Sequence, residues 1–575
     1  MIMDNNSNMI KKLYLCSALT VAGIQLLNAA TPLADYSDGV FVVNEDWYGH
    51  CNSTINFLKG DGEWIYRVVQ QENPGFELGC TNQYGAIYGG KFYLIAKQDK
   101  DPGASTYGAR ITVCSANDMS ILKQIRIISN DKNATSGPDG RGFLGVDEHK
   151  GYVGSSNGIF VLDLDNLEIV GYISGTENGA ETGYDELYGG QIGNMVRVDD
   201  YVYAVHQSKG LLVIDAATDK VVDVVEAPDG KGFGSVVLSK DGNLWLSIAT
   251  NSSGGADKSI MRLNPATRES SVIALPEGIY GPANSWYAWT PDGFCASTKH
   301  NVLYWNGGAS SWFSGSQVFK YDIDNNVYSK IIDLDADGEN WKIYGCSMRV
   351  HPIDDELYAS LFHEFGNKAY IFRRYDSCGS KIEDFSMIEN YWFPSLPVFP
   401  DVAAPEMRTF EQSISSTEPT EIALRGLATD DDNIDAAIVY SLGDVDVSGS
   451  SRVDVRVADG KLVITPVDVK EGETCTIEIK ANSNGKVVSG ESKVVFGNSG
   501  AVDARKVDST FSIATYMRNI AVNGIEDTEL VEIYSATGAL VAVAKVSDGS
   551  ARATLPSAGA YVVVAGGKAS KVIVR

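Results

Sequence analysis

Short apolar strands separated by tight polar turns recur through the first 400 residues. The pattern predicts a strand at 40–43 and then strand–turn–strand hairpins at 84–96, 143–154, 191–205, 235–248, 286–297 and 344–361. A second pair of strands follows each hairpin, most clearly at 210–215 and 220–226. Four strands per unit, repeated at about 40 to 60 residues, are typical of a β-propeller. The seven units therefore predict seven blades.

Changes in residue composition and strand pattern along the chain also predict where domains begin and end. No strand precedes 40–43, whereas 391–399 has an aromatic start like that at 286, so 391–399 is expected to supply the missing strand and close a propeller over 31–401. Residues 405–497 lose the aromatics and alternate Val, Thr and Ser with polar turns, which is typical of an immunoglobulin-like or cadherin-like sandwich. A linker at 498–522 and a small β unit at 523–575 follow. The predicted fold class is all-β: a seven-bladed β-propeller followed by an immunoglobulin-like β-sandwich and a small C-terminal β domain.

The first thirty residues indicate export. Lys11 and Lys12 precede an apolar run at 13–27, and Ala29 and Ala30 follow it. A basic start, a short apolar run and small residues are typical of a secretory signal peptide at 1–30. No later run approaches the ~18 apolar residues of a membrane helix, so no transmembrane segment is predicted.

Charge narrows the possible partners. The 575 residues carry a formal net charge of −27. Nucleic-acid and anionic-membrane binding both depend on clustered Lys and Arg, so neither partner is expected.

Cysteines and acidic turns provide weaker structural expectations. Cys51 and Cys80 are expected on one rim of adjacent blades, where a disulfide between them is a candidate. Asp333, Asp335 and Asp337, and separately the segment 430–433, are oxygen-rich. Each is either a structural calcium loop or an ordinary solvated turn. The first segment lacks the Glu that would complete a calcium loop. No other cofactor is predicted.

Candidate ligand-binding residues come from propeller geometry. The starts of innermost strands and the loops after second strands share one rim, and a rim rich in Trp, Tyr and His suits a flat, partly polar ligand. The alternative is that the aromatics pack between blades and the histidines are hydrogen-bonded loop residues. The candidates are Trp47, Tyr48, His50, Tyr84, Arg141, Gln191, His206, Lys231, Trp286, His300, Trp305, Trp341 and His363.

No catalytic constellation is evident. The chain has no HExxH motif or phosphate-binding glycine loop, and the Gly-x-Ser-x-Gly text at 154–158 lies between two strands, where a nucleophile elbow would need a helix. No catalytic residue is predicted, and a binding role is favoured over an enzymatic one.

The C-terminal 50 residues resemble the type A C-terminal sorting domain of the type IX secretion system of Bacteroidota. The matching segments are 531–535, 555–561 and 571–574, with Gly538 between them. The resemblance implies passage to the cell exterior, so a secreted or cell-surface protein is expected.

Residues 36–401 resemble the YncE-like or surface-layer propellers of gut Bacteroidota. The matching segments are 39–45, 211–215, 220–222 and 391–394. One branch of these propellers captures vitamin B12 and passes it to a TonB-dependent outer-membrane transporter, so the resemblance implies a corrinoid ligand and that partner. Two alternatives stay open. One is a lactonase or glycan-active enzyme using acids such as Asp139 and Glu186, and the other is an adhesion or surface-layer protein that works through its sandwich.

Overall fold

The computed structural model describes residues 31–178, 187–251, 254–282, 284, 286, 293–307, 314–363, 366–497, 512–516, 519–525, 528, 530–535, 538–547, 549–557, 559–566 and 568–574. The predicted signal peptide therefore lies outside the described residues. Within them, no helix combines the length and hydropathy needed to cross a bilayer.

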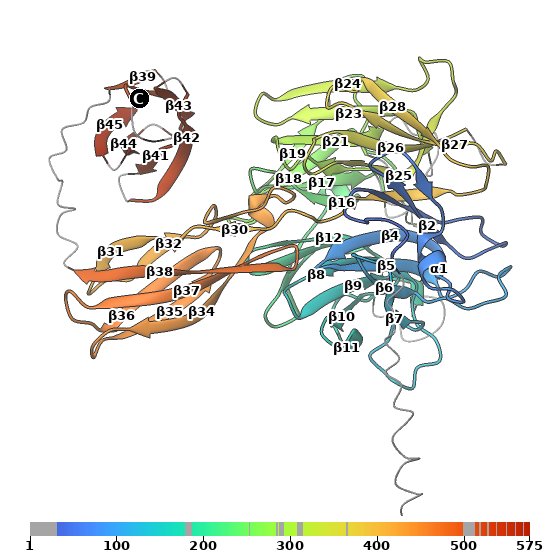
Figure 1. Ribbon diagram of the computed structural model, residues 1–575, viewed down its shortest axis with the longest axis horizontal. Helices are drawn as coiled ribbons and strands as arrows, with labels where there is room; N and C mark the ends of the chain where they lie inside the picture. The colour runs from blue at the N-terminus through green and yellow to red at the C-terminus, as the bar shows by residue number, and fades with distance from the viewer. Residues whose placement is uncertain are drawn as a thin grey trace, which may run out of the picture.

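Seven antiparallel sheets form a ring, and each is called a blade here (Figure 1). From the innermost strand outward, blade 1 contains β29 (Pro394–Val398), β1 (Gly39–Asn44), β2 (Thr54–Lys59) and β3 (Trp64–Ile65); blade 2 contains β4 (Cys80–Tyr88), β5 (Lys91–Gln98), β6 (Ile111–Ser115) and β7 (Ile121–Ile125); blade 3 contains β8 (Gly140–Gly145), β9 (Lys150–Ser155), β10 (Ile159–Asp163) and β11 (Glu168–Tyr172). Blade 4 contains β12 (Ile192–Val198), β13 (Tyr201–His206), β14 (Gly210–Asp215) and β15 (Lys220–Val225); blade 5 contains β16 (Gly232–Leu238), β17 (Leu244–Ala249), β18 (Ser259–Leu263) and β19 (Ser270–Ala274). Blade 6 contains β20 (Cys295–Ala296), β21 (Val302–Gly307), β23 (Gln317–Asp322) and β24 (Val327–Asp333); blade 7 contains β25 (Lys342–Val350), β26 (Leu357–Phe362), β27 (Tyr370–Tyr375) and β28 (Lys381–Ser386), with the short β22 (Ser314–Gly315) beside β25. The predicted fold class, an all-β chain with a seven-bladed propeller, is confirmed.

Both ends of the propeller meet in blade 1. Strand β29 follows blade 7 in the chain but pairs antiparallel with β1, so that Val398 lies opposite Phe41 and Leu396 opposite Val43. As the innermost strand, β29 has one free edge, which is where the missing N–H groups of Pro394 and Pro397 can be tolerated. Strand β25 of blade 7 contacts β29 and completes the ring.

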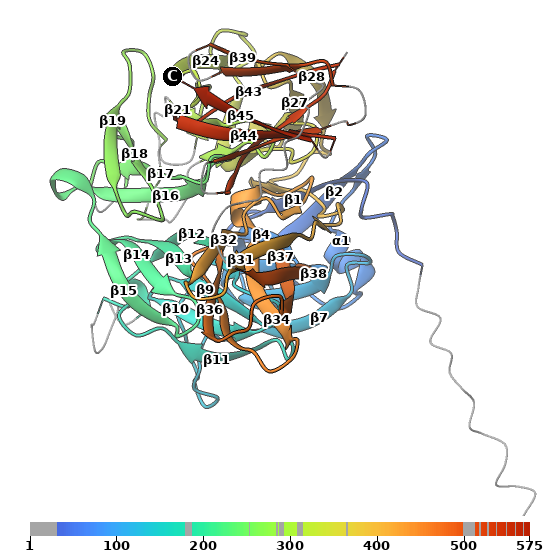
Figure 2. The ribbon, with the colours of Figure 1, turned by 90° about the vertical axis from the view of Figure 1, so that its left-hand side faces the viewer.

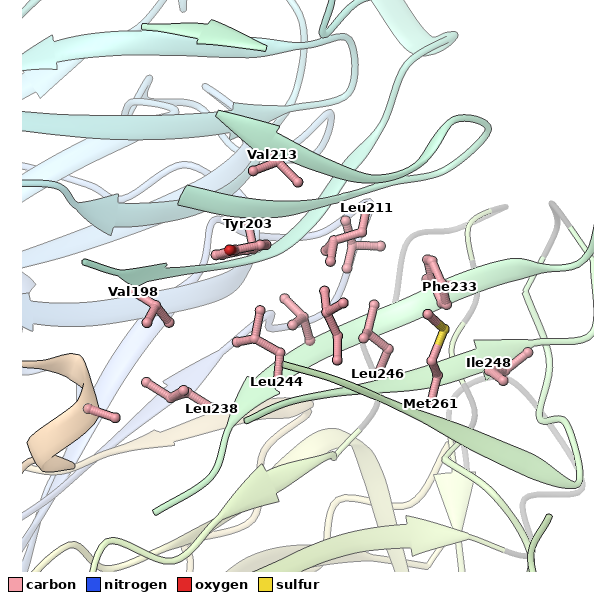
Figure 3. Packing of buried hydrophobic residues seen from close by; sticks show 14 of the residues in the cluster. Val198, Tyr203, Leu211, Val213, Phe233, Leu238, Leu244, Leu246, Ile248 and Met261 are labelled. Atoms are coloured by element: carbon pink, nitrogen blue, oxygen red, sulfur yellow. The ribbon is translucent and has the colours of Figure 1, made fainter. Parts of the chain in front are cut away.

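Apolar side chains fill the layers between blades. Strand β14 is apolar and buried over its first five residues because blades cover both of its sides, whereas the outermost strand β15 is largely exposed. Tyr203 and Val213 of blade 4 belong to the same buried cluster as Phe233 and Leu246 of blade 5 (Figure 3). Each such burial contributes about 1.5–3 kcal/mol, and this packing holds adjacent blades together.

Blade 6 departs from its predicted hairpin. The sequence predicts a turn at residues 292–293, but β20 and β21 pair with Cys295 opposite Tyr304, so the turn lies at residues 297–301. The prediction of a hairpin at 286–297 is wrong by one strand. Two polar segments of similar length follow each other here, and both carry residues that favour turns.

Short helices interrupt the strands, among them α1 (Val68–Glu72) and the single 3-10 turns η1 (Pro228–Gly230) and η2 (Asp435–Ala437). Helix α1 contacts β2 and buries Val68 and Val69 in the core of blades 1 and 2.

Residues 405–497 form two sheets around one core. The first contains β31 (Glu411–Ser415), β38 (Lys486–Gly497), β37 (Thr474–Ser483) and β34 (Val439–Val447), and the second contains β32 (Thr420–Ala423), β36 (Lys461–Asp468) and β35 (Arg452–Ala458). A separate pair joins β30 (Glu406–Met407) to β33 (Ala428–Thr429). Strands β31 and β38 run parallel, and the other pairs are antiparallel. The core includes Ile464, Ile477 and Phe496. This unit is called the sandwich below, and its immunoglobulin-like character stays a prediction.

The sandwich covers one face of the ring. The face where innermost strands begin is called the upper face here, and the face where they end is the lower face. In Figure 2 the sandwich lies in front of the propeller, and the contacts place it against the lower face. Gly89 N–H in the turn between β4 and β5 donates to the Asn484 carbonyl at 3.0 Å, and Asp459 N–H donates to Asp200 Oδ2 of blade 4 at 2.8 Å. Ile434 of the sandwich lies in the apolar cluster of blades 4 and 5.

One lysine joins the sandwich to the end of the closing strand. Lys486 Nζ lies 3.1 Å from Asp430 Oδ2 and 3.1 Å from Asp432 Oδ1, and it also contacts Asp401 and the Ala403 carbonyl. The side chains of the three aspartates are 9 % exposed or less. The candidate calcium turn at 430–433 therefore has the ammonium of Lys486 among its carboxylates.

The sandwich also bounds a cavity at the lower end of the channel. The cavity measures about 420 Å³ and is lined mainly by apolar residues of the innermost strands, such as Val236, Leu396 and Val398. Asp432, Ile434 and Asn484 of the sandwich complete its walls.

The C-terminal residues form a separate β unit. One sheet contains β39 (Ser512–Tyr516), β40 (Asn519–Asn523) and β43 (Ser550–Thr554), and the other contains β42 (Leu540–Lys545), β41 (Leu530–Ser535), β44 (Gly559–Ala565) and β45 (Lys568–Val574). Strands β39 and β40 fall within the predicted linker at 498–522, so the later part of that linker prediction is wrong. The identity of this unit as a sorting domain stays a prediction.

Candidate functional site

Charged and amide side chains from four blades converge at the upper end of the central channel. Gln83 at the start of β4 donates to Glu45 Oε1 at 2.6 Å, which links blades 2 and 1. Arg141 at the start of β8 donates through Nε to Gln191 Oε1 at 3.0 Å, which links blades 3 and 4. Arg141 also lies 3.8 Å from Asp139. These residues, with Lys97 and Gln207, are called the mouth cluster.

The amide of Gln191 carries this network further around the channel. Its Nε2 donates to Gln207 Oε1 at 3.1 Å and to the Trp286 carbonyl at 2.7 Å. Gln83 Oε1, although buried, has no hydrogen-bond partner among the described residues. A polar atom left in that state is one to which a ligand or an ordered water can donate.

The mouth cluster holds its charges in a poorly solvated place. Burial lowers the pKa of Lys97 to about 8, and the neighbouring Arg141 acts in the same direction. Burial raises the pKa of both Glu45 and Asp139, while Lys97 opposes each shift. Opposite charges therefore stabilise one another across the mouth, which gives it the means to orient a ligand that carries amide or carboxyl groups.

A second group of side chains covers the upper face of blades 7 and 1. Trp47 packs against His50 in a tilted arrangement with ring centroids 3.8 Å apart, and its ring centroid lies 4.1 Å from that of Tyr391. Trp341 stacks on His363 at 3.7 Å and an interplanar angle of 20°. Trp47 is 39 % exposed and Tyr48 is 59 % exposed. These residues are called the aromatic sector; they come from the loops before β25 and β29 and after β1 and β26.

A buried carboxyl lies directly after β1, beside the aromatic sector. Asp46 is 2 % exposed, has a left-handed backbone with φ of 57°, and accepts a hydrogen bond from Thr54 Oγ1 at 2.7 Å. Its Oδ1 has no hydrogen-bond partner among the described residues. Burial raises the pKa of Asp46 to about 7.

The structure brings some of the predicted rim residues together and separates others. Trp47, Tyr48, His50, Trp341 and His363 lie in the aromatic sector, and Arg141 and Gln191 lie in the mouth cluster. Tyr84 lines the channel lower down, where its hydroxyl donates to the Phe143 carbonyl at 2.8 Å. Lys231 pairs with Asp257 at 2.8 Å, outside both groups.

Four predicted rim residues do not present a surface to a ligand on the upper face. Trp286 and Trp305 are fully buried, with indole N–H groups that donate to the carbonyls of Phe233 and Tyr280. His206 is also buried; its Nε2 contacts the Thr176 carbonyl at 3.0 Å, and burial lowers its pKa to about 4. His300 lies in the turn between β20 and β21, which is on the lower face. The predicted rim position is wrong for His300, which occupies the turn at the opposite end of the strands, and the side chains of the other three face a neighbouring blade.

The candidate disulfide is not formed, and the acidic turn at 333–337 has protein partners for two of its aspartates. Cys51 and Cys80 are free, and the Cys80 thiol lies 3.4 Å from Asp101 Oδ2. Asp333 pairs with Lys330, and Asp335 accepts a hydrogen bond from Ser316 at 2.6 Å. No cluster of three His, Cys, Asp or Glu side chains suited to a metal occurs in the part of the chain that the structure describes.

Sequence reasoning missed several residues of the upper face. Glu45 and Lys97 end second strands, and Lys368 and Tyr391 occupy loops of blades 7 and 1. The signal that identifies Glu45 and Lys97 is a charge at the end of an apolar strand. Glu186, a candidate acid of the enzymatic alternative, lies outside the described residues.

Fold and site together define a seven-bladed β-propeller with a polar channel mouth and an aromatic sector on its upper face. The chain belongs to the family described as a domain of unknown function, DUF5074, which it matches over residues 38–400. No curated protein matches the chain.

Two solved structures illustrate what this chain is similar to. A quinonprotein alcohol dehydrogenase-like protein from Bacteroides thetaiotaomicron is 18 % identical, with a TM-score of 0.47, over 64 % of this chain and 79 % of that one. The β-propeller domain of Cps50 (Swd1) from Myceliophteria thermophila is 11 % identical, with a TM-score of 0.34, over 54 % of this chain and 93 % of that one.

Proposed function

We propose that this chain is an exported cell-surface protein that captures a nutrient or cofactor at the mouth cluster, with a corrinoid as the ligand and a TonB-dependent outer-membrane transporter as the recipient. The observation that carries the proposal is the convergence of amide and charged side chains from four blades at the upper end of the channel. The sandwich covers the other end, so capture takes place from the upper face.

The chemistry of a corrinoid matches this arrangement. A corrinoid is a wide, flat ring that carries amide groups around its edge. Gln83 offers its amide oxygen, which has no partner among the described residues, and Arg141 offers a guanidinium with several donors in a fixed plane. A flat ring also gains affinity by covering apolar surface without covalent chemistry. The predicted signal peptide and sorting-domain resemblance support the external location.

Calorimetric titration of residues 31–575 with cyanocobalamin tests the proposal. We expect submicromolar binding that EDTA does not change. Arg141→Met should raise Kd about ten-fold or more, because the loss of a charge-assisted contact costs 1.4 kcal/mol or more. The matched control is Arg452→Met, since the Arg452 side chain is 72 % exposed on the sandwich. An absence of heat at high micromolar cyanocobalamin would refute the corrinoid proposal.

A further inference from the structure

A polar cleft lies against the Trp341–His363 stack of the aromatic sector. The cleft measures about 790 Å³ and is lined by Glu339, Asn340, His363, Gly366, Asn367, Lys368 and Glu389. One side is formed by His363 on its Trp341 partner. The other includes Lys368, whose Nζ lies 5.2 Å from the centre of the Tyr391 ring, which in turn contacts Trp47. The loops of blades 7 and 1 thus place aromatic faces and hydrogen-bonding groups around one open space.

The polar groups of the cleft are held in position. His363 Nδ1 lies 3.3 Å from the Asn340 carbonyl, which fixes the imidazole over Trp341. Glu339 pairs with Arg373 at 3.2 Å. Asn367 accepts a hydrogen bond from Ala369 N–H at 2.9 Å, and its NH₂ group has no acceptor among the described residues. The cleft therefore offers a fixed donor, carboxylate acceptors and a cation within one surface.

We propose that this cleft binds a neutral oligosaccharide, with the His363 ring, held on Trp341, as a platform for a pyranose ring inside the cleft. The exposed ring of Trp47, which contacts Tyr391 next to Lys368, is a second platform beside the cleft. The C–H face of a pyranose is apolar and covers an aromatic ring, while its hydroxyls require both donors and acceptors. Amides and carboxylates in an open, hydrated cleft meet that requirement. This site is distinct from the mouth cluster and does not depend on the corrinoid proposal.

Charge favours a neutral glycan over an acidic one. The chain carries a formal net charge of −27, and two of the charged residues that line the cleft, Glu339 and Glu389, are acidic. A sulfated or uronic-acid polymer would meet repulsion both at long range and within the cleft, whereas a neutral sugar would not.

The test is binding of residues 31–575 to immobilised cellohexaose, laminarihexaose, mannohexaose and N-acetylchitohexaose. We expect at least one of them to bind with a micromolar to millimolar Kd. Trp47→Ala should weaken that binding about ten-fold, as the loss of one aromatic contact predicts, and Trp47→Phe should restore most of it. Tyr107→Ala is the matched control, because Tyr107 is 53 % exposed on blade 2, away from the cleft.

A second pair of variants separates this site from the mouth cluster. Asn367→Ala and Lys368→Ala should weaken glycan binding and leave cyanocobalamin titration unchanged, and neither exposed change should prevent folding. Failure of every glycan to bind would overturn the proposal, as would glycan binding that survives both Trp47→Ala and Asn367→Ala. The cyanocobalamin result tests only the proposed function, so the two ideas can fail independently.

Discussion

The two faces of the propeller use polar residues in opposite ways. On the lower face, charged and amide groups such as Lys486, Asn484 and Asp200 contact groups across the boundary with the sandwich. On the upper face, Gln83 and Asp46 bury polar atoms that have no hydrogen-bond partner among the described residues, and Trp47 and Tyr48 are exposed. Buried polar groups are normally paired. The lower face also leaves Asn301 Oδ1 without a partner among the described residues, so it is the exposed Trp47 and Tyr48 that mark the upper face as the one to examine for a ligand. The lower face thus resembles a domain interface and the upper face a binding surface.

The largest effect is expected from a substitution that disrupts the contact between the lower face and the sandwich. Lys486→Met removes a cation from among three buried carboxylates, and an uncompensated buried charge costs about 3–5 kcal/mol. We expect the urea midpoint to fall and the segment that joins propeller to sandwich to become sensitive to protease. The control is Lys493→Met, because Lys493 pairs with Glu411 on the exposed side of the sandwich and should change the free energy of unfolding by about 0–1 kcal/mol. Equal effects of the two variants would contradict the account of the interface.

A smaller effect is expected at Asp46, a buried carboxyl on the upper face. The folded state raises the pKa of Asp46 from 3.8 to about 7, so its protonated form is favoured and stability falls as pH rises from about 4 to 7. Asp46→Asn keeps an acceptor for Thr54 and cannot ionise. We expect this variant to be more stable than the wild type by about 2 kcal/mol at pH 8, with the difference shrinking toward pH 4.

Thermal melts across pH 4 to 8 measure this difference. Asp163→Asn provides a control of opposite sign, because hydrogen bonds from Asn166 lower the pKa of Asp163 and stabilise its ionised form. The Asp163→Asn variant should become less stable relative to the wild type as pH rises, because it lacks the ionised carboxyl that the wild type stabilises. A pH-independent difference for Asp46→Asn would show that the carboxyl does not titrate in the folded protein as we infer.

The smallest expected effect concerns the exposed aromatics. Tyr48 is 59 % exposed, so Tyr48→Ala should change the free energy of unfolding by no more than about 0.5 kcal/mol. Chemical denaturation measures the change. A loss of several kcal/mol would mean that Tyr48 supports the fold and that its exposure is no sign of a binding surface.

The sequence predicts the repeat well because turn residues punctuate it. Gly89 and Gly90 both adopt positive φ between β4 and β5, where the sequence predicts a hairpin turn. Blade 6 is the exception, because two consecutive segments carry turn signals and local sequence does not rank them. Strand β29 lies in the segment that the sequence predicts will complete blade 1. The signal is a repeat, because aromatic residues begin this segment at 391–393 as an aromatic residue begins the blade 6 segment at 286.

The candidate site is less predictable for a physical reason. Strand ends identify the upper face, yet Trp47 is exposed there and Trp286 is buried, although both precede or follow a strand on the same rim. The direction of each side chain depends on how neighbouring blades pack, which a single strand does not encode. Docking of the sandwich depends on contacts such as that of Lys486 with Asp401. These residues are far apart in the chain, so no local sequence pattern predicts the contact.

The position of Asp401 has a mechanical consequence. It lies three residues after β29, the strand that closes the ring, and β29 pairs with β1 along one edge only. Tension applied through the C-terminal part of the chain would otherwise peel β29 from β1 one hydrogen-bond pair at a time. Because Lys486 binds Asp401 and the Ala403 carbonyl, such a load passes into the sandwich and is shared as shear over the several blades that the sandwich contacts. The pairing of β29 with β1, which closes the ring, is thereby protected against separation.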